Sequence, residues 1–246
     1  FVMVQYALMA NEWEEYGETL YFESVYFTAV PFVELFITVM IIFFLGTEYG
    51  DGTIRNKLIA GNTRTDIYSA NLLTAVFVSV LLDAVFLVCG LIGLPFMECG
   101  AGFGKMLLYS AVTLFFSIST GAIVTLVGML VTNKAGSSTI SILLFFGLLI
   151  FASFLITRLN EPEMHSYMEM TSEGLQLVGP IVNPSYVGGA QRVVYECITN
   201  TLPSGQAIML SNMELEHPVF DIAVSAFLSA AVSAAGLMIF NKKDIK

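Results

Sequence analysis

Five long apolar runs constrain this chain more than any other feature of its sequence. Each is close to the length of about 20 residues that an α-helix needs to cross the hydrocarbon core of a bilayer. Backbone polar groups in lipid must be satisfied within their own segment, so runs of this length cross as helices. The predicted spans are residues 25–46, 70–96, 106–132, 138–156 and 219–240.

The composition agrees with a membrane protein. Of the 246 residues, 56% are hydrophobic and 12% are charged, whereas an ordinary soluble domain carries about twice that share of charge. This balance excludes a disordered chain and a nucleic-acid-binding protein. We expect the partners of such a chain to be membrane lipid and other proteins.

Residues 1–10 predict part of a sixth span. They are too apolar for a loop and too short to cross a membrane, and they lack the charged start and the cleavage site of a secretory signal. We expect them to be the outer end of a first transmembrane helix whose beginning is missing from this sequence. The expected fold is an all-α, six-helix transmembrane bundle, a single domain over residues 1–246 with a truncated first helix.

Lysine and arginine orient the predicted helices, because cytoplasmic loops carry an excess of both. Residues 47–69, the turn at 133–137 and the C-terminal tail hold most of the basic residues. We therefore assign these segments to the cytoplasm, with both termini of the full-length chain on that side. The loops of the opposite face hold most of the acids that make the net charge −10.

The stretch 157–218 is the largest of the acidic loops. We expect it to be an extracellular helical cap over the ends of the spans, with residues 191–198 in a helix. The alternative is a gate or a substrate-contacting surface whose negative field attracts cationic ligands.

A short helix is predicted inside the cytoplasmic loop at 47–69, over residues 53–61. Gly52 and Gly61 mark its ends, since glycine readily adopts the turn and left-handed conformations found there. Ile54, Leu58 and Ile59 are predicted to share one face. So short a helix needs a surface to pack on, and its position suits contact with a cytoplasmic partner.

The helix that follows this loop has a recognisable start. Thr63 and Asp66 form the pattern of a capping box, with Asp in place of the usual Glu or Gln. For the whole segment 47–69, the alternative interpretation is a basic loop that only follows the charge bias of cytoplasmic segments.

The sequence of this loop closely resembles that of one transporter family. Residues 48–58 read EYGDGTIRNKL, and Gly61, Thr63-Arg64 and Ile67-Tyr68 follow. This run resembles the loop after the second span in ABC-2 type transporter permeases, the membrane subunits of bacterial drug, bacteriocin-immunity and peptide exporters. The number of spans, the large loop before the last span and the lysine-rich C-terminus also resemble that family, whereas Asn71 departs from it where a Lys is expected.

The resemblance implies a coupling helix that docks on a separate ATP-binding subunit. The residues expected to contact that subunit are Thr53, Ile54, Arg55, Asn56, Lys57, Leu58 and Arg64. Those expected to support the helix are Glu48, which we expect to pair with a nearby base, and Gly52, Gly61 and Tyr68. The resemblance also implies a second permease chain, identical or homologous, a bacterial plasma membrane, and export of an amphiphilic substrate such as an antimicrobial peptide or a drug.

An ATP site is not expected in this chain. The segment nearest to a P-loop, residues 99–106, has Cys99 in place of the first glycine and Met106 in place of the hydroxyl that binds Mg²⁺. We therefore expect no catalytic residues, no metal site and no bound cofactor here, with ATP and Mg²⁺ on the partner subunit. Cys99 and Cys197 are both predicted on the extracellular face, where a disulfide between them is one option.

Two acidic residues fall inside predicted spans. Glu34 and Asp83 each lie about midway along their span, and a carboxylate at that depth is a candidate functional group because its burial is costly. One hypothesis places them along the substrate path, and the other has them facing the bundle interior with hydroxyl partners. They also support a rival function, a proton-coupled secondary transporter, and a third class remains, a membrane sensor or anchor that transports nothing.

Overall fold

The computed structural model describes residues 21–50, 52–94, 98–171 and 174–243. The predicted span at 1–10 lies outside these residues. Within them, five helices are long and apolar enough to cross a membrane, as in a multi-pass membrane protein.

The five long helices correspond to the five apolar runs. The first span comprises α2 (Phe22–Phe27) and α3 (Val30–Gly50), and the others are α5 (Arg64–Gly93), α6 (Phe103–Leu130), α7 (Lys134–Leu159) and α10 (Pro218–Lys242). Helix α5 begins six residues before the predicted start of its span. The break between α2 and α3 precedes Pro31, which has no N–H to continue the hydrogen-bond ladder.

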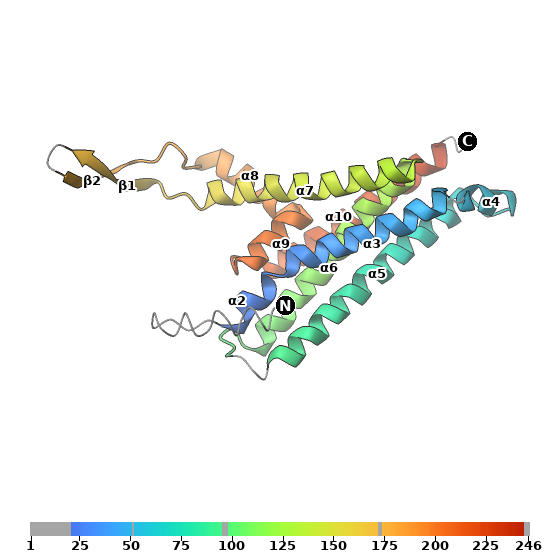
Figure 1. The fold of residues 1–246 in the computed structure, drawn as a ribbon, viewed down its shortest axis with the longest axis horizontal. Coiled ribbons are helices and arrows are strands. Elements are labelled where there is room, and N and C mark those ends of the chain that lie inside the picture. The colour runs from blue at the N-terminus through green and yellow to red at the C-terminus, as the bar shows by residue number, and fades with distance from the viewer. Residues whose placement is uncertain (1–20, 51, 95–97, 172–173, 244–246) are drawn as a thin grey trace.

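The two ends of the bundle differ in what they carry (Figure 1). At one end lie the short helix α4 (Thr53–Ile59), the turn between α6 and α7, and the end of α10. We call this the α4 end. The loop before α6 and the residues between α7 and α10 lie at the other end, which we call the cap end. The three basic loops therefore share one end of the molecule, as the charge pattern predicts.

The cap end is only partly helical. Helix α8 (Gly189–Thr201) confirms the helix expected at residues 191–198, and α9 (Pro203–Ser211) follows it. Strands β1 (Met164–Thr171) and β2 (Gly174–Val182), however, form an antiparallel hairpin. The expectation of a purely helical cap was therefore wrong. The period of two in Met164, Met168 and Met170 is a strand signal that the prediction did not use.

Helix α6 is the central element of the bundle. It packs against α3, α5 and α10, and most of its side chains are buried. Small residues allow this close approach, since a Cβ at Gly128 would lie 2.6 Å from Cδ1 of Leu45 on α3. Helix α7 packs mainly against α3, α8 and α9.

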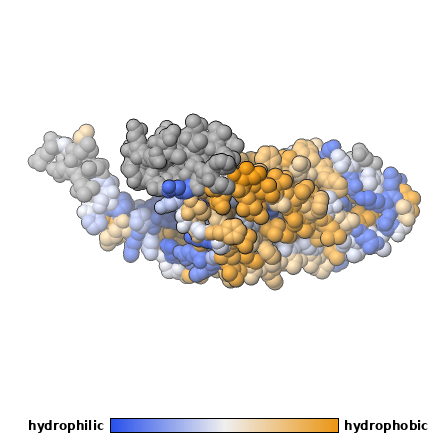
Figure 2. Space-filling view, turned by 90° about the horizontal axis from the view of Figure 1, so that it is seen from below, coloured by the Kyte–Doolittle hydropathy of each residue, from blue (hydrophilic) through white to orange (hydrophobic). Residues whose placement is uncertain are grey.

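Large apolar side chains cover the outside of the bundle. They form a broad band between hydrophilic ends in the space-filling view (Figure 2). A soluble monomer does not expose so much continuous apolar surface, so the band matches the hydrocarbon layer of a membrane. Examples on α3, α5, α7 and α10 are Phe32, Phe36, Phe77, Leu143, Ile150 and Phe227.

Candidate functional site

Backbone geometry at both ends sets the length of helix α4. Gly52 precedes it in the left-handed region, with φ of 67°, and Gly61 follows it with φ of 94°. The N–H of Gly61 donates to the carbonyl of Leu58 and that of Asn62 to the carbonyl of Lys57, each at 3.1 Å. These two bonds are the Schellman pattern that closes a helix, so both glycines end the helix as predicted.

Helix α4 has a buried face and an exposed tip. Ile54 is 1% exposed and Leu58 packs against the same apolar cluster, whereas Ile59 is 75% exposed. The prediction that Ile59 shares the buried face was wrong, because five residues along a helix correspond to a turn of about 140° away from Ile54. Arg55 and Asn56 are also exposed. Helix α4 therefore exposes three different side chains, the basic Arg55, the amide Asn56 and the apolar Ile59.

An ion pair joins α4 to the end of α3. The Lys57 ammonium contacts the Glu48 carboxylate, which confirms the expectation that Glu48 pairs with a nearby base. Partly exposed pairs of this kind add little stability, but this one connects α4 to the end of α3. Lys57 is thus engaged within the chain, and Arg55 is the exposed basic residue of α4.

Arg64 lies toward α10 rather than toward the exposed tip of α4. Its guanidinium donates to the carbonyls of Phe240, at 3.3 Å, and of Lys243, where a cation complements the C-terminal end of a helix. The Lys243 ammonium donates to the carbonyl of Met129 at 2.9 Å, and burial lowers the pKa of this amine. Tyr68 is buried with its ring 5.9 Å from that of Phe240. The start of α5 and the ends of α6 and α10 are therefore joined.

The capping box at the start of α5 is present. The N–H of Asp66 donates to the Thr63 hydroxyl and the N–H of Thr63 to the Asp66 carboxylate, both at 3.1 Å. Helix α5 consequently starts at a defined residue. The chain between α4 and α5 is only four residues long, 60–63. A displacement of α4 would therefore also move the start of α5.

Each intramembrane acid meets a hydroxyl of α6. Thr120 donates to Glu34 at 2.7 Å, and Ser117 donates to Asp83 at 3.2 Å. Glu34 is 1% exposed and Asp83 is 7% exposed. No Lys, Arg or His in the described part of the chain forms an ion pair with either acid. This arrangement matches the hypothesis of interior acids with hydroxyl partners.

Cys99 and Cys197 are not joined in the structure. Both are free and exposed, Cys99 just before α6 and Cys197 on α8. The disulfide considered from the sequence is therefore absent here.

A cavity at the cap end was not predicted. Its volume is about 440 Å³, and it lies between the end of α7, helices α8 and α9, and the first turn of α10. The acidic residues of 157–218 were the available signal, but their convergence depends on contacts between segments far apart in the sequence. We call this site the cap cavity.

No family model and no curated protein matches this chain. The likeness to ABC-2 permeases therefore depends on the loop sequence and the order of spans.

Proposed function

We propose that the chain is the membrane-spanning permease subunit of an ABC exporter in a bacterial plasma membrane. In this proposal α4 is the coupling helix, the α4 end faces the cytoplasm, and a separate ATP-binding subunit docks there. ATP and Mg²⁺ are bound by that subunit. A second permease chain, identical or homologous, completes the pathway for an amphiphilic substrate.

One observation carries the proposal. A seven-residue helix with Arg55, Asn56 and Ile59 exposed is attached to the ends of three spans, through the Lys57–Glu48 pair, the short connection to α5, and the Arg64 bonds to α10. A rigid element transmits a displacement only if both its docking surface and its attachments are firm. A basic loop that only obeys the charge bias of cytoplasmic segments needs neither feature.

Arg55→Glu is expected to abolish co-purification with the ATP-binding subunit. The substitution places a negative charge on the exposed tip of α4, and charge reversal at an interface costs enough to weaken binding by at least about tenfold. The measurement is the ATPase activity that elutes with an affinity-tagged chain produced in its native host. The presence of a P-loop protein in the eluate is checked by mass spectrometry.

Two variants control for the charge change. Arg55→Lys keeps the charge, and Lys242→Glu reverses an exposed charge at the same end but on α10; both should retain ATPase activity. Equal ATPase activity with Arg55→Glu and with the unaltered chain would remove the coupling assignment. An intact complex that moves no substrate would favour the sensor or anchor function instead.

The rival function, a proton-coupled carrier, is tested at Glu34. Glu34→Gln keeps an oxygen that can accept the Thr120 hydrogen bond but cannot ionise. We expect this variant to retain ATP-dependent transport into vesicles, and an uncoupler to leave transport unchanged. The carrier would be favoured by two results together. Glu34→Gln or the uncoupler would abolish transport, and transport by the unaltered chain would not require ATP.

A further inference from the structure

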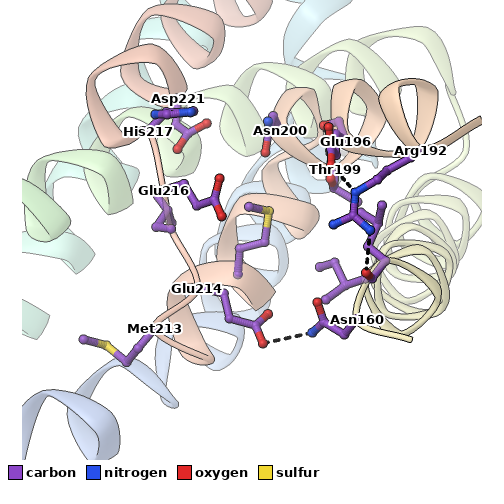
Figure 3. Close-up of a pocket in the computed structure, with 14 residues that line it drawn as sticks. Asn160, Arg192, Glu196, Thr199, Asn200, Met213, Glu214, Glu216, His217 and Asp221 are labelled. Carbon is purple, nitrogen blue, oxygen red and sulfur yellow. Dashed lines mark hydrogen bonds and ion pairs between the residues drawn. The ribbon is translucent and has the colours of Figure 1, made fainter. Parts of the chain in front are cut away.

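The cap cavity has an acidic lining that its own bases do not neutralise (Figure 3). Four carboxylates line it, and the basic residues of the lining are Arg192 and His217. The cavity is lined by Ile156, Leu159, Asn160, Arg192, Glu196, Thr199, Asn200, Met209, Met213, Glu214, Leu215, Glu216, His217 and Asp221.

Arg192 is already engaged. Its Nε donates to Glu196 at 2.9 Å, one turn along α8, and its Nη1 donates to the carbonyl of Leu159 at 3.2 Å. Within the described residues, Glu214 accepts from two neutral amides, that of Asn160 at 2.9 Å and that of Asn212 at 3.3 Å. Glu196 is thus matched by a cation and Glu214 is not.

Two further acids form no ion pair in the described part of the chain, although the imidazole of His217 interacts electrostatically with Asp221. Glu216 is exposed, whereas Asp221 is 2% exposed and has one carboxylate oxygen without a hydrogen-bond partner. No ion pair in the described part of the chain involves Glu214, Glu216 or Asp221. A buried acidic oxygen without a partner is costly; Asp221 lines the cavity, although this one oxygen is covered by protein.

Apolar side chains from several elements share the remaining lining with Asn160, Thr199, Asn200 and His217. Leu159, Met209 and Met213 contribute side chains from the end of α7 and from α9 and its following turn, and methionine adapts its shape to varied apolar groups. Ligand sites commonly combine such apolar walls with a few convergent polar groups, in volumes of about 300–1,000 Å³. Among the described residues, no three His, Cys, Asp or Glu lie close enough to hold a metal ion. The lining therefore suits an organic cation.

We propose that the cap cavity binds a soluble cationic amphiphile, with an alkylammonium or guanidinium group at Asp221 and Glu216 and its apolar part against Leu159, Met209 and Met213. A lysine or arginine side chain of an amphiphilic peptide has this chemistry. Binding requires only this chain. That the bound molecule is also the transported substrate depends on the function proposed above.

The test is direct binding to the purified full chain in phosphatidylcholine nanodiscs. The probe is a short fluorescent peptide of alternating lysine and leucine, compared with the same peptide after acetylation of its lysines. We expect saturable binding of the cationic peptide, and at least about tenfold weaker binding after Asp221→Asn, because a desolvated charge partner is lost. Glu163→Gln, which neutralises an exposed acid outside the cavity, should bind as the unaltered chain does.

A second variant keeps the test decisive if Asp221→Asn does not fold. Glu216→Gln changes an exposed side chain and should also weaken binding, with an unchanged gel-filtration profile. Equal binding of the acetylated peptide, equal weakening by Glu163→Gln, or competition by phosphatidylethanolamine added to the nanodiscs would each overturn the proposal. Absence of binding together with intact co-purification of the ATPase would remove this inference and leave the proposed function standing.

Discussion

Replacing Gly205 with alanine is expected to detach helix α9 from α8 and to lower the stability of the protein by about 3 kcal/mol. A Cβ at this position would overlap the carbonyl oxygen of Thr199 and lie 2.9 Å from its Cα. These are backbone atoms, so no rotamer change can relieve the overlap. The turn between α8 and α9 must open instead.

Opening this turn would break the polar contacts that hold α9 in place. Gln206 donates to the carbonyl of Asn200 at 2.5 Å and accepts from the Ser225 hydroxyl at 2.7 Å. Ser225 in turn accepts at its carbonyl from Ser119 of α6. These hydrogen bonds connect the cap end to α6, so their loss should destabilise both the cap end and the bundle.

The measurement is the temperature at which the detergent-solubilised chain loses its gel-filtration peak. A loss of 3 kcal/mol corresponds to a decrease of about 8 °C in a protein of this size. Gly147→Ala is the matched control, because a Cβ there meets nothing within 4 Å. Equal melting temperatures for Gly205→Ala and Gly147→Ala would show that the backbone contact is not close.

Gly236→Ala is expected to lower stability by about 2 kcal/mol through a clash with Tyr68. The new Cβ would overlap the Tyr68 hydroxyl and lie 2.6 Å from Cζ of the ring. Tyr68 is 1% exposed and its hydroxyl has no hydrogen-bond partner in the described residues. The ring therefore has little room to move away.

A double-mutant cycle with Tyr68→Phe identifies the cause. Tyr68→Phe alone removes an unpartnered hydroxyl and should leave stability unchanged or raise it. Combined with Gly236→Ala, it removes the atom that the new Cβ overlaps, so at least about 1 kcal/mol should be recovered. Additive effects in melting temperature would contradict this account of the contact between α5 and α10.

Local rules predicted the features that depend on neighbouring residues. The five spans follow from the length of the apolar runs, and the glycine ends of α4 and the capping box at Thr63 follow from short patterns. Each of these is settled within a few residues of the chain. The sequence therefore determined most of the transmembrane architecture and the limits of the candidate coupling helix.

Features that depend on distant contacts could not be predicted in the same way. Arg64 follows Lys57 by seven residues in the loop sequence, yet its guanidinium donates to carbonyls at the end of α10, about 180 residues away in the chain. The cap cavity brings Asn160 of the α7 end to Glu214 and Asp221 near the start of α10. A single sequence does not state which loop residues meet, because the packing of α8 and α9 decides this.

The hydrogen bonds from α6 to the intramembrane acids also constrain how the chain can be assembled in the membrane. Glu34 and Asp83 are synthesised before Thr120 and Ser117, which supply their hydrogen bonds. Until α6 enters the bilayer, the first two described spans carry carboxyl groups whose exposure to lipid costs several kcal/mol. We therefore expect α3 and α5 to be stable in the bilayer only together with α6, because α6 supplies the hydrogen bonds to both acids.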